Sequence, residues 1–324
     1  QIKDQLIGRS EQFYNSLDDS WPGTAYQVTD RGICPMSGAS CDEGGEPLAE
    51  RKSEVLYAPV EPGYLGKRNC VRCRFFITGP AFLGGLLALL NELSLEIETE
   101  RERYQKTQLR VEELENLQYD CERAEIPFFH DNELRRAHSD YEESSCKLDM
   151  YLCDFTCTHR LVARCFALLN KSSDQNKQND GNYDLIATDA IADVGLEASE
   201  NQCNFRLLSE ICSNATIYTG ANPSRAIPKR SLLIDRMADN NGLEPAMFRL
   251  TEENQLEIGN QLTQLLLKRL ESWKAVDQLF SGQKMLSELD QDASLQPLNK
   301  EVQGLLNSGS INFTQYQEKI ENYD

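Results

Sequence analysis

The chain has 324 residues, of which 40% are hydrophobic and 26% charged, as in a soluble globular protein of about two domains. Its formal net charge of −19 excludes a protein that binds duplex DNA along its whole surface, because such a surface is normally basic. The longest apolar run, Ala81 to Leu90, is too short to cross a bilayer. We therefore expect a cytoplasmic protein without membrane contact.

Residues 1–23 read as a polar helix or linker that ends at the Trp21-Pro22-Gly23 breaker. Because the first residue is Gln rather than Met, we expect this segment to continue a longer upstream part. Residues 24–80 differ, since Gly, Pro and Cys punctuate them and short apolar stretches at 55–60 and 75–77 predict small strands. This pattern predicts a compact, loop-rich module that a metal must stabilise.

Two close pairs of cysteines in this module predict a structural zinc site formed by Cys34, Cys41, Cys70 and Cys73. Each pair supplies two thiolates at about 2.3 Å from the ion, and the loop between the pairs lets them close into a tetrahedron. Four protein ligands leave no open position, so we expect no catalytic metal. Buried unliganded thiols, a redox pair and disulfides are the alternatives. The redox reading lacks a βαβ context, and an odd total of 11 cysteines weakens a disulfide framework.

Basic side chains surround the second cysteine pair. Phosphate contacts are expected from Lys67, Arg68, Arg72 and Arg74. We therefore predict a local and weak contact with DNA rather than an extended interface. A second basic group lies later in the chain, at Arg225, Lys229, Arg230 and Arg236.

Residues 81–170 predict an antiparallel, coiled-coil-like helical hairpin. Apolar side chains recur every three or four residues, or multiples, on both arms: Leu86, Leu90, Leu93, Ile97, Tyr104, Val111, Leu114 and Cys121, then Leu134, Tyr141, Leu148, Leu152, Phe155, His159, Val162, Phe166 and Leu169. Ile126-Pro127 ends the first arm. The hairpin is either purely structural or a surface for protein partners or self-association.

Two features of the second arm have alternative readings. His159 lies on the apolar stripe, so we predict a buried, hydrogen-bonded histidine rather than a ligand. Cys146, Cys153 and Cys157 are predicted on the opposite face, where they either bind a metal or pack as small apolar residues.

Beyond the hairpin, residues 171–182 read as a polar linker and residues 183–275 as an α-helical region. Helices are predicted near 183–198, 200–214, 229–240 and 251–270, the last one capped by Thr251. Residues 276–324 read as a polar, weakly helical tail. The predicted fold is therefore mainly α: a small four-cysteine zinc-stabilised module, then a long antiparallel hairpin, then a further helical region.

No catalytic constellation is apparent in these residues. There is no phosphate-binding glycine loop, no dinucleotide fingerprint and no zinc-protease helix motif. None of the three histidines begins the His-x-x-Arg pattern of tyrosine recombinases. We therefore assign no catalytic residue and no small-molecule substrate.

The segment YLGKRNCVRCRFFITGPAFLGGL, residues 64–86, is more distinctive than a generic zinc motif. It resembles a block of large integrase-type proteins of bacterial integrative elements, the gamma-mobile-trio integrase family. The resemblance extends to residues 32–45 and 57–60, continues more loosely through the helical hairpin, and reappears at 230–250 and 257–270. It implies a role in DNA integration and recombination in the bacterial cytoplasm, with a recombinase-like core upstream and this chain as the C-terminal accessory region.

Two function hypotheses follow. In the first, the zinc module contacts DNA locally through its basic rim, and the helices contact other proteins during integration. In the second, the chain is a non-catalytic protein-interaction scaffold in which zinc only stabilises the first module and the acidic helices bind a partner.

Overall fold

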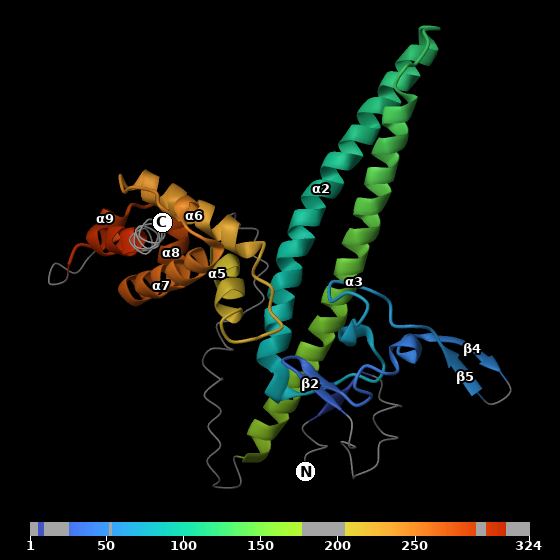
Figure 1. The fold of residues 1–324 in the computed structure, drawn as a ribbon, viewed down its shortest axis with the longest axis horizontal. Coiled ribbons are helices and arrows are strands. Elements are labelled where there is room, and N and C mark those ends of the chain that lie inside the picture. The colour runs from blue at the N-terminus through green and yellow to red at the C-terminus, as the bar shows by residue number, and fades with distance from the viewer. Residues whose placement is uncertain (1–5, 10–25, 52–53, 177–204, 290–295, 309–324) are drawn as a thin grey trace, which may run out of the picture. The chain divides into compact units, whose positions relative to one another are not determined.

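The computed structural model describes residues 6–9, 26–51, 54–176, 205–289 and 296–308. The chain divides into two compact units, Gln1–Asp180 and Gly181–Asp324, which we describe separately. Helices dominate both units, and small sheets lie only in the first among these described ranges (Figure 1). The predicted mainly helical fold is confirmed.

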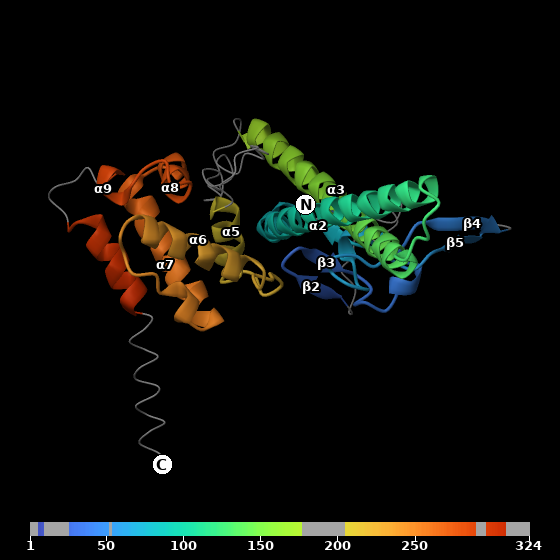
Figure 2. The same cartoon turned by 90° about the horizontal axis from the view of Figure 1, so that it is seen from above.

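A small antiparallel sheet organises the first unit. Its strands are β1 (Ile7–Gly8), β2 (Gln27–Thr29), β3 (Gly32–Cys34) and β6 (Ile77–Thr78), in the order β1-β6-β3-β2. A separate two-stranded ribbon pairs β4 (Pro47–Arg51) with β5 (Glu54–Tyr57) and projects from the module (Figure 2). The predicted short strands near 55–60 and 75–77 are thus present. The helix predicted across the first residues is wrong at β1, and the rest of that prediction lies outside the described residues.

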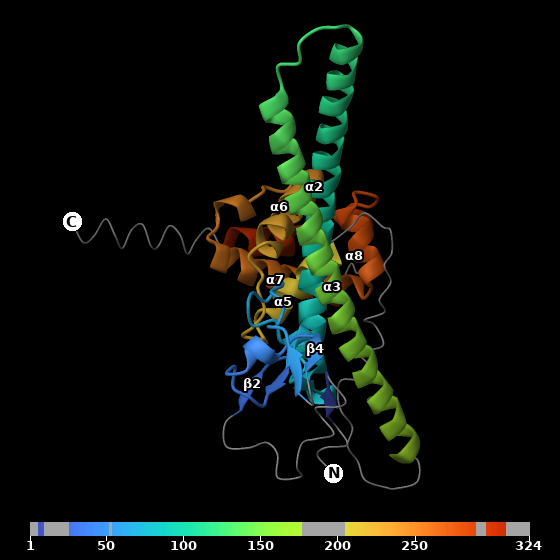
Figure 3. The ribbon, with the colours of Figure 1, turned by 90° about the vertical axis from the view of Figure 1, so that its right-hand side faces the viewer.

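Two long helices form the predicted hairpin. Helix α2 (Leu83–Arg123) and helix α3 (Asp131–Asn176) lie side by side and antiparallel (Figure 3). The hydroxyls of Tyr104 and Tyr141 lie 2.9 Å apart, and nearer the turn Arg110 pairs with Glu133. Because α3 continues to residue 176, the first part of the predicted linker is helical. The remainder of that linker lies outside the described residues.

The seam between α2 and α3 is more polar than the sequence pattern predicted. Leu86, Leu90 and Leu93 are buried on α2 as expected. On α3, however, the buried face includes Ser144, Asp154 and Thr158. Hydrogen bonds offset the cost of burying these polar groups. Ser144 donates to a buried carboxylate of α2, Asp154 accepts from the cysteine module, and Thr158 donates to the Asp154 carbonyl.

The buried face of α3 is thus rotated about the helix axis from the predicted one, and this difference corrects three predictions. Leu152 is 43% exposed rather than buried, and His159 is exposed and stacks on Phe155 with ring centroids 6.3 Å apart. The three cysteines predicted on one outer face are also separated. Cys146 and Cys153 are exposed, whereas Cys157 is buried.

One helical stretch among the described residues, Pro80–Arg123, has the length and apolar composition of a membrane span. Its apolar window is 56% buried inside the protein. A core helix of a soluble protein passes the same test, so this stretch is weak support for membrane insertion.

The second unit is a helical assembly around an apolar core. It contains α5 (Phe205–Asn214), α6 (Ala226–Asn240), α7 (Glu252–Leu270), α8 (Trp273–Phe280), α9 (Leu286–Leu289) and a helix over residues 298–308. The predicted helices near 200–214, 229–240 and 251–270 are confirmed, and the one near 183–198 lies outside the described residues. The expected polar tail is wrong over 276–289 and 296–308, because several of its apolar side chains are completely buried in the core, namely Val276, Leu286, Leu298, Val302 and Leu306.

Candidate metal site and its contacts with the helical hairpin

The sheet of the first unit brings the two cysteine pairs together. Strand β3 ends at Cys34, and β6 begins four residues after Cys73. The two strands pair antiparallel at Ile33 and Ile77, so the end of β3 lies beside the start of β6. All four predicted cysteines consequently line one cavity of about 40 Å³, together with residues that include Gly38, Arg68, Asn69 and Phe76.

Tight backbone turns hold each cysteine pair. The Gly38 amide donates to Cys34 Sγ at 3.3 Å, and the Cys41 thiol donates to the Gly38 carbonyl at 3.4 Å. Gly38 needs the left-handed backbone conformation that glycine favours, with φ of +81°. The Cys73 amide donates to the Cys70 carbonyl at 3.0 Å and closes the second turn.

The thiols are close enough to influence one another. Burial raises the pKa of the Cys73 thiol to about 11, and the other three thiols add to this effect. Burial also raises the pKa of Cys70, and the nearby guanidinium groups of Arg31 and Arg68 oppose that rise. The two cations suit a cluster of thiolates around Zn²⁺, because four thiolates and one Zn²⁺ carry a net negative charge.

The donor chemistry of this cavity suits zinc. Soft thiolates prefer Zn²⁺ over hard cations, and the four donors match a closed structural site. Asn69, which also lines the cavity, has a buried Oδ1 with no hydrogen-bond partner among the described residues. In the part of the chain that the structure describes, however, no group of three or more His, Cys, Asp or Glu side chains is already arranged to hold a metal ion. Zinc ligation therefore stays a prediction.

Asp154 of α3 joins the second cysteine loop to the hairpin. Its side chain is 1% exposed and accepts hydrogen bonds from the Tyr64 amide at 2.7 Å, from Asn69 Nδ2 at 2.8 Å and from Arg72 Nε at 2.5 Å. The Tyr64 hydroxyl also donates to the buried Glu92 of α2 at 2.9 Å. Burial, together with Glu92, raises the pKa of that hydroxyl, which keeps it a donor. One loop thus contacts both helices.

Sequence reasoning missed Asp154 and Glu92. Both are acidic residues in helices rich in exposed acids, so composition and periodicity assign them to solvent. The available signal for Asp154 is its position, since it lies three residues after Tyr151 and four before Thr158, on the face that is in fact buried. This position indicates a buried Asp154 only once the loop residues that donate to it are known.

The four basic residues predicted to contact phosphate have different environments. Arg72 is an internal residue: its side chain is 10% exposed and also donates to Glu61 at 2.6 Å and to the Met150 carbonyl at 2.7 Å. The Arg74 guanidinium lies over the rings of Tyr57 and Phe75, and its Nε donates to a carbonyl.

Lys67 and Arg68 are exposed. The predicted four-residue basic rim is thus reduced to two openly exposed cations.

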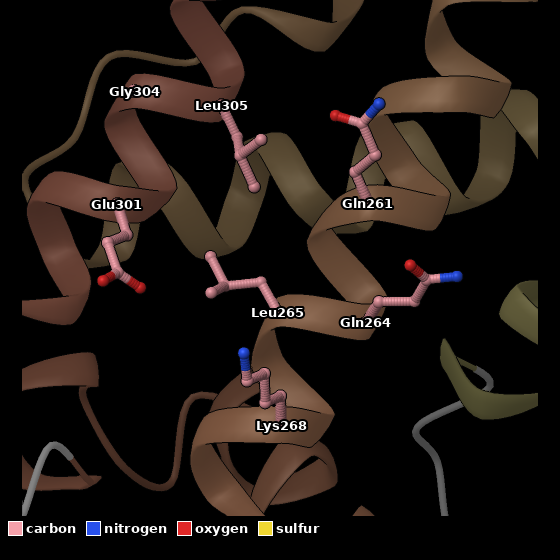
Figure 4. Close-up of a pocket in the computed structure, with 7 residues that line it drawn as sticks. All are labelled: Gln261, Gln264, Leu265, Lys268, Glu301, Gly304 and Leu305. Carbon is pink, nitrogen blue, oxygen red and sulfur yellow. The ribbon is translucent and has the colours of Figure 1, made fainter.

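The second unit has a larger and more open hollow. It has a volume of about 500 Å³ and lies between α7 and the helix over 298–308 (Figure 4). Figure 4 shows the side chains that line it: Gln261, Gln264, Leu265, Lys268, Glu301 and Leu305, beside Gly304. Glu301 pairs with Arg269 at 3.1 Å. This lining has no nucleophile beside a base, the pair that nucleophilic catalysis requires.

Comparisons with protein-family profiles, with curated proteins and with solved structures find no match to this chain. The resemblance described for the cysteine block therefore depends on its residues alone.

Proposed function

We propose that this chain is a non-catalytic accessory region that acts in DNA integration as part of an integrase-like protein of a bacterial mobile element. In this proposal a structural Zn²⁺ on Cys34, Cys41, Cys70 and Cys73 stabilises the first module against the helical hairpin. The supporting observation is that these four cysteines, from two distant segments, line one cavity. The role in integration derives from the resemblance of the cysteine block.

A further observation supports the proposed compartment. All cysteines of the described residues are free thiols. Free thiols suit a reducing compartment such as the bacterial cytoplasm.

Metal content of the purified chain tests this proposal. We expect about one zinc per chain by mass spectrometry under native conditions, as one four-thiolate site requires. The double variant Cys70→Ser/Cys73→Ser should lose it. The matched control Cys146→Ser removes an exposed thiol of α3 and should keep the metal. A wild-type chain without zinc, prepared with zinc present throughout, would overturn the proposed site.

DNA contact by the module would depend on Lys67 and Arg68. Two phosphate contacts contribute a salt dependence of only about two in the slope of log affinity against log salt, so binding of this chain alone is weak. The variant Lys67→Ala/Arg68→Ala should lower affinity equally for all sequences. The control Arg101→Ala/Lys106→Ala removes the same charge from exposed positions of α2. Equal affinities of the two variants across a salt titration would rule out this contact.

A protein-interaction scaffold is the second candidate, and the hairpin turn favours it. Phe129 is 83% exposed, Tyr119 is 63% exposed and Ile126 is 58% exposed. Apolar side chains grouped at one end of a hairpin are typical of a protein contact surface. Light scattering that shows an oligomer, converted to monomer by Phe129→Ser, together with no DNA binding, would favour the scaffold over the DNA contact.

A further inference from the structure

The loop that supplies two of the proposed zinc ligands also supplies the donors that bind the Asp154 carboxylate. Asn69 directly precedes Cys70, and Arg72 directly precedes Cys73. Their side chains donate to the same Asp154 oxygen, at 2.8 Å from Asn69 Nδ2 and 2.5 Å from Arg72 Nε. The cysteine positions and the donor positions are therefore set by the same short backbone segment.

The contact with α3 covers one helical turn. Arg72 Nη2 donates to the carbonyl of Met150, and Arg72 Nε donates to the carboxylate of Asp154, four residues later. Gly63 allows the close approach, because a Cβ at that position would lie 2.2 Å from Asp154 Oδ2. The fit leaves no room for an added methyl group at Gly63.

A buried carboxylate is stable only while its donors remain in place. Asp154 is almost completely buried, so loss of its donors leaves an unpaired charge inside the hairpin seam. The segment that carries Asn69 and Arg72 is short, and its backbone forms one turn of 3₁₀ helix, Cys70–Arg72. Bonds from Cys70 and Cys73 to a metal would fix both ends of that turn.

We infer that metal loading of the four-cysteine site is transmitted to the hairpin through Asp154. With the metal bound, Asn69 and Arg72 are held against α3 and the seam stays closed around residue 154. When the metal leaves, the donors disperse and this part of α3 opens. The inference depends on the proposed zinc site and adds to it a metal-sensitive contact between module and hairpin.

The opening is expected to be local. Closer to the turn, the hairpin is held by contacts of its own, including Tyr104 with Tyr141 and Arg110 with Glu133. These pairs involve only α2 and α3, so metal removal should leave them intact. The region around Asp154 and the region near the turn therefore serve as test and internal reference in one molecule.

Hydrogen exchange of the complete chain, read by mass spectrometry together with zinc content, tests the inference. Stripping zinc from the wild type should accelerate exchange around residues 150–158 by at least about tenfold, with little change around 104–141. Asp154→Asn should keep its zinc and yet show the same acceleration. Gly63→Ala offers an independent break of the contact without a change of charge. Asp149→Asn, at an exposed position of the same helix, should behave as wild type.

The outcomes separate this inference from the proposed function. Zinc that binds and can be removed without any change around 150–158 overturns the inference and leaves the metal site standing. Acceleration in Asp149→Asn equal to that in Asp154→Asn also overturns it, because the effect would then be one of helix charge. A chain that never binds zinc overturns both.

Discussion

The two units of this protein are stabilised in different ways. In the Gln1–Asp180 unit the seam between α2 and α3 buries the carboxylates of Glu92, Glu96, Glu100 and Asp154. In the Gly181–Asp324 unit the helices share an apolar core, and the charged side chain buried among its described residues is Arg230. Apolar packing needs no particular partner, whereas each buried carboxylate needs its own donors. The first unit should therefore respond to metal, charge and single donors, and the second mainly to side-chain volume.

Arg230 fits this contrast, because backbone groups rather than an acid surround it. Its guanidinium donates to the carbonyls of Gln255 and Leu256 and, at 2.6 Å, to Asn260 Oδ1. Gly259 makes room for it, since a Cβ there would lie 2.4 Å from Nη2. Arg230 was part of the second basic group in the sequence and is in fact completely inaccessible.

Loss of a zinc ligand should produce the largest difference between the units. Cys73→Ser should unfold residues 26–80, because structural zinc contributes on the order of 10 kcal/mol to the folding of a small metal-dependent module. Limited proteolysis should then cut at Lys67 and Arg68, while the fluorescence of Trp273 in α8, read in a Trp21→Phe background, stays unchanged. Cys146→Ser is the control. Protease resistance equal to wild type would show that the module does not depend on a metal.

The Arg72–Asp154 pair sharpens the comparison within the first unit. Arg72→Ala leaves a buried carboxylate without its cationic partner and should cost about 3–5 kcal/mol of local stability. Arg110→Ala removes exposed pairs with Glu113 and Glu133 on the same hairpin and should cost little. Hydrogen exchange of α3 measures both. Equal effects would mean that burial of the first pair does not matter.

This pair also shows what the sequence could and could not predict. Helical periodicity predicts α2, α3, α5, α6 and α7, because a buried stripe must recur every three or four residues. The spacing of the cysteines separately predicts that all four lie at one site, because two close pairs in one small module have few ways to fold apart. Arg72 was misread as a surface cation, because its partner Asp154 is distant along the chain and local sequence says nothing about it.

The end of the second unit was misread for a different reason. Residues 276–308 are mostly polar, so the average composition predicts a tail. Several apolar side chains there are nevertheless buried in the common core, for example Leu286 and Leu306. Short helices with one or two anchors carry too little periodicity for a sequence pattern to detect.

A substitution that creates a cavity in the apolar core tests how the second unit is stabilised. Leu262 of α7 is completely buried, so Leu262→Ala should cost about 2–5 kcal/mol. Urea unfolding followed through Trp273 measures this directly in a Trp21→Phe background, because the chain has two tryptophans. Leu232→Ala, at a position that is 61% exposed, is the control and should change stability little. Sensitivity of this transition to zinc removal would break the contrast between the units.

The cap of α7 should give the smallest effect. The Thr251 side chain accepts a hydrogen bond from the Asn254 amide at 3.4 Å, and it satisfies a helix donor that otherwise lacks an intrahelical partner. Thr251→Ala should therefore cost about 1 kcal/mol in the Trp273 unfolding transition. Thr251→Ser keeps the oxygen and should recover most of that loss. If the serine variant were as unstable as the alanine variant, the methyl group rather than the capping oxygen would stabilise this helix end, and packing alone would account for the second unit down to its termini.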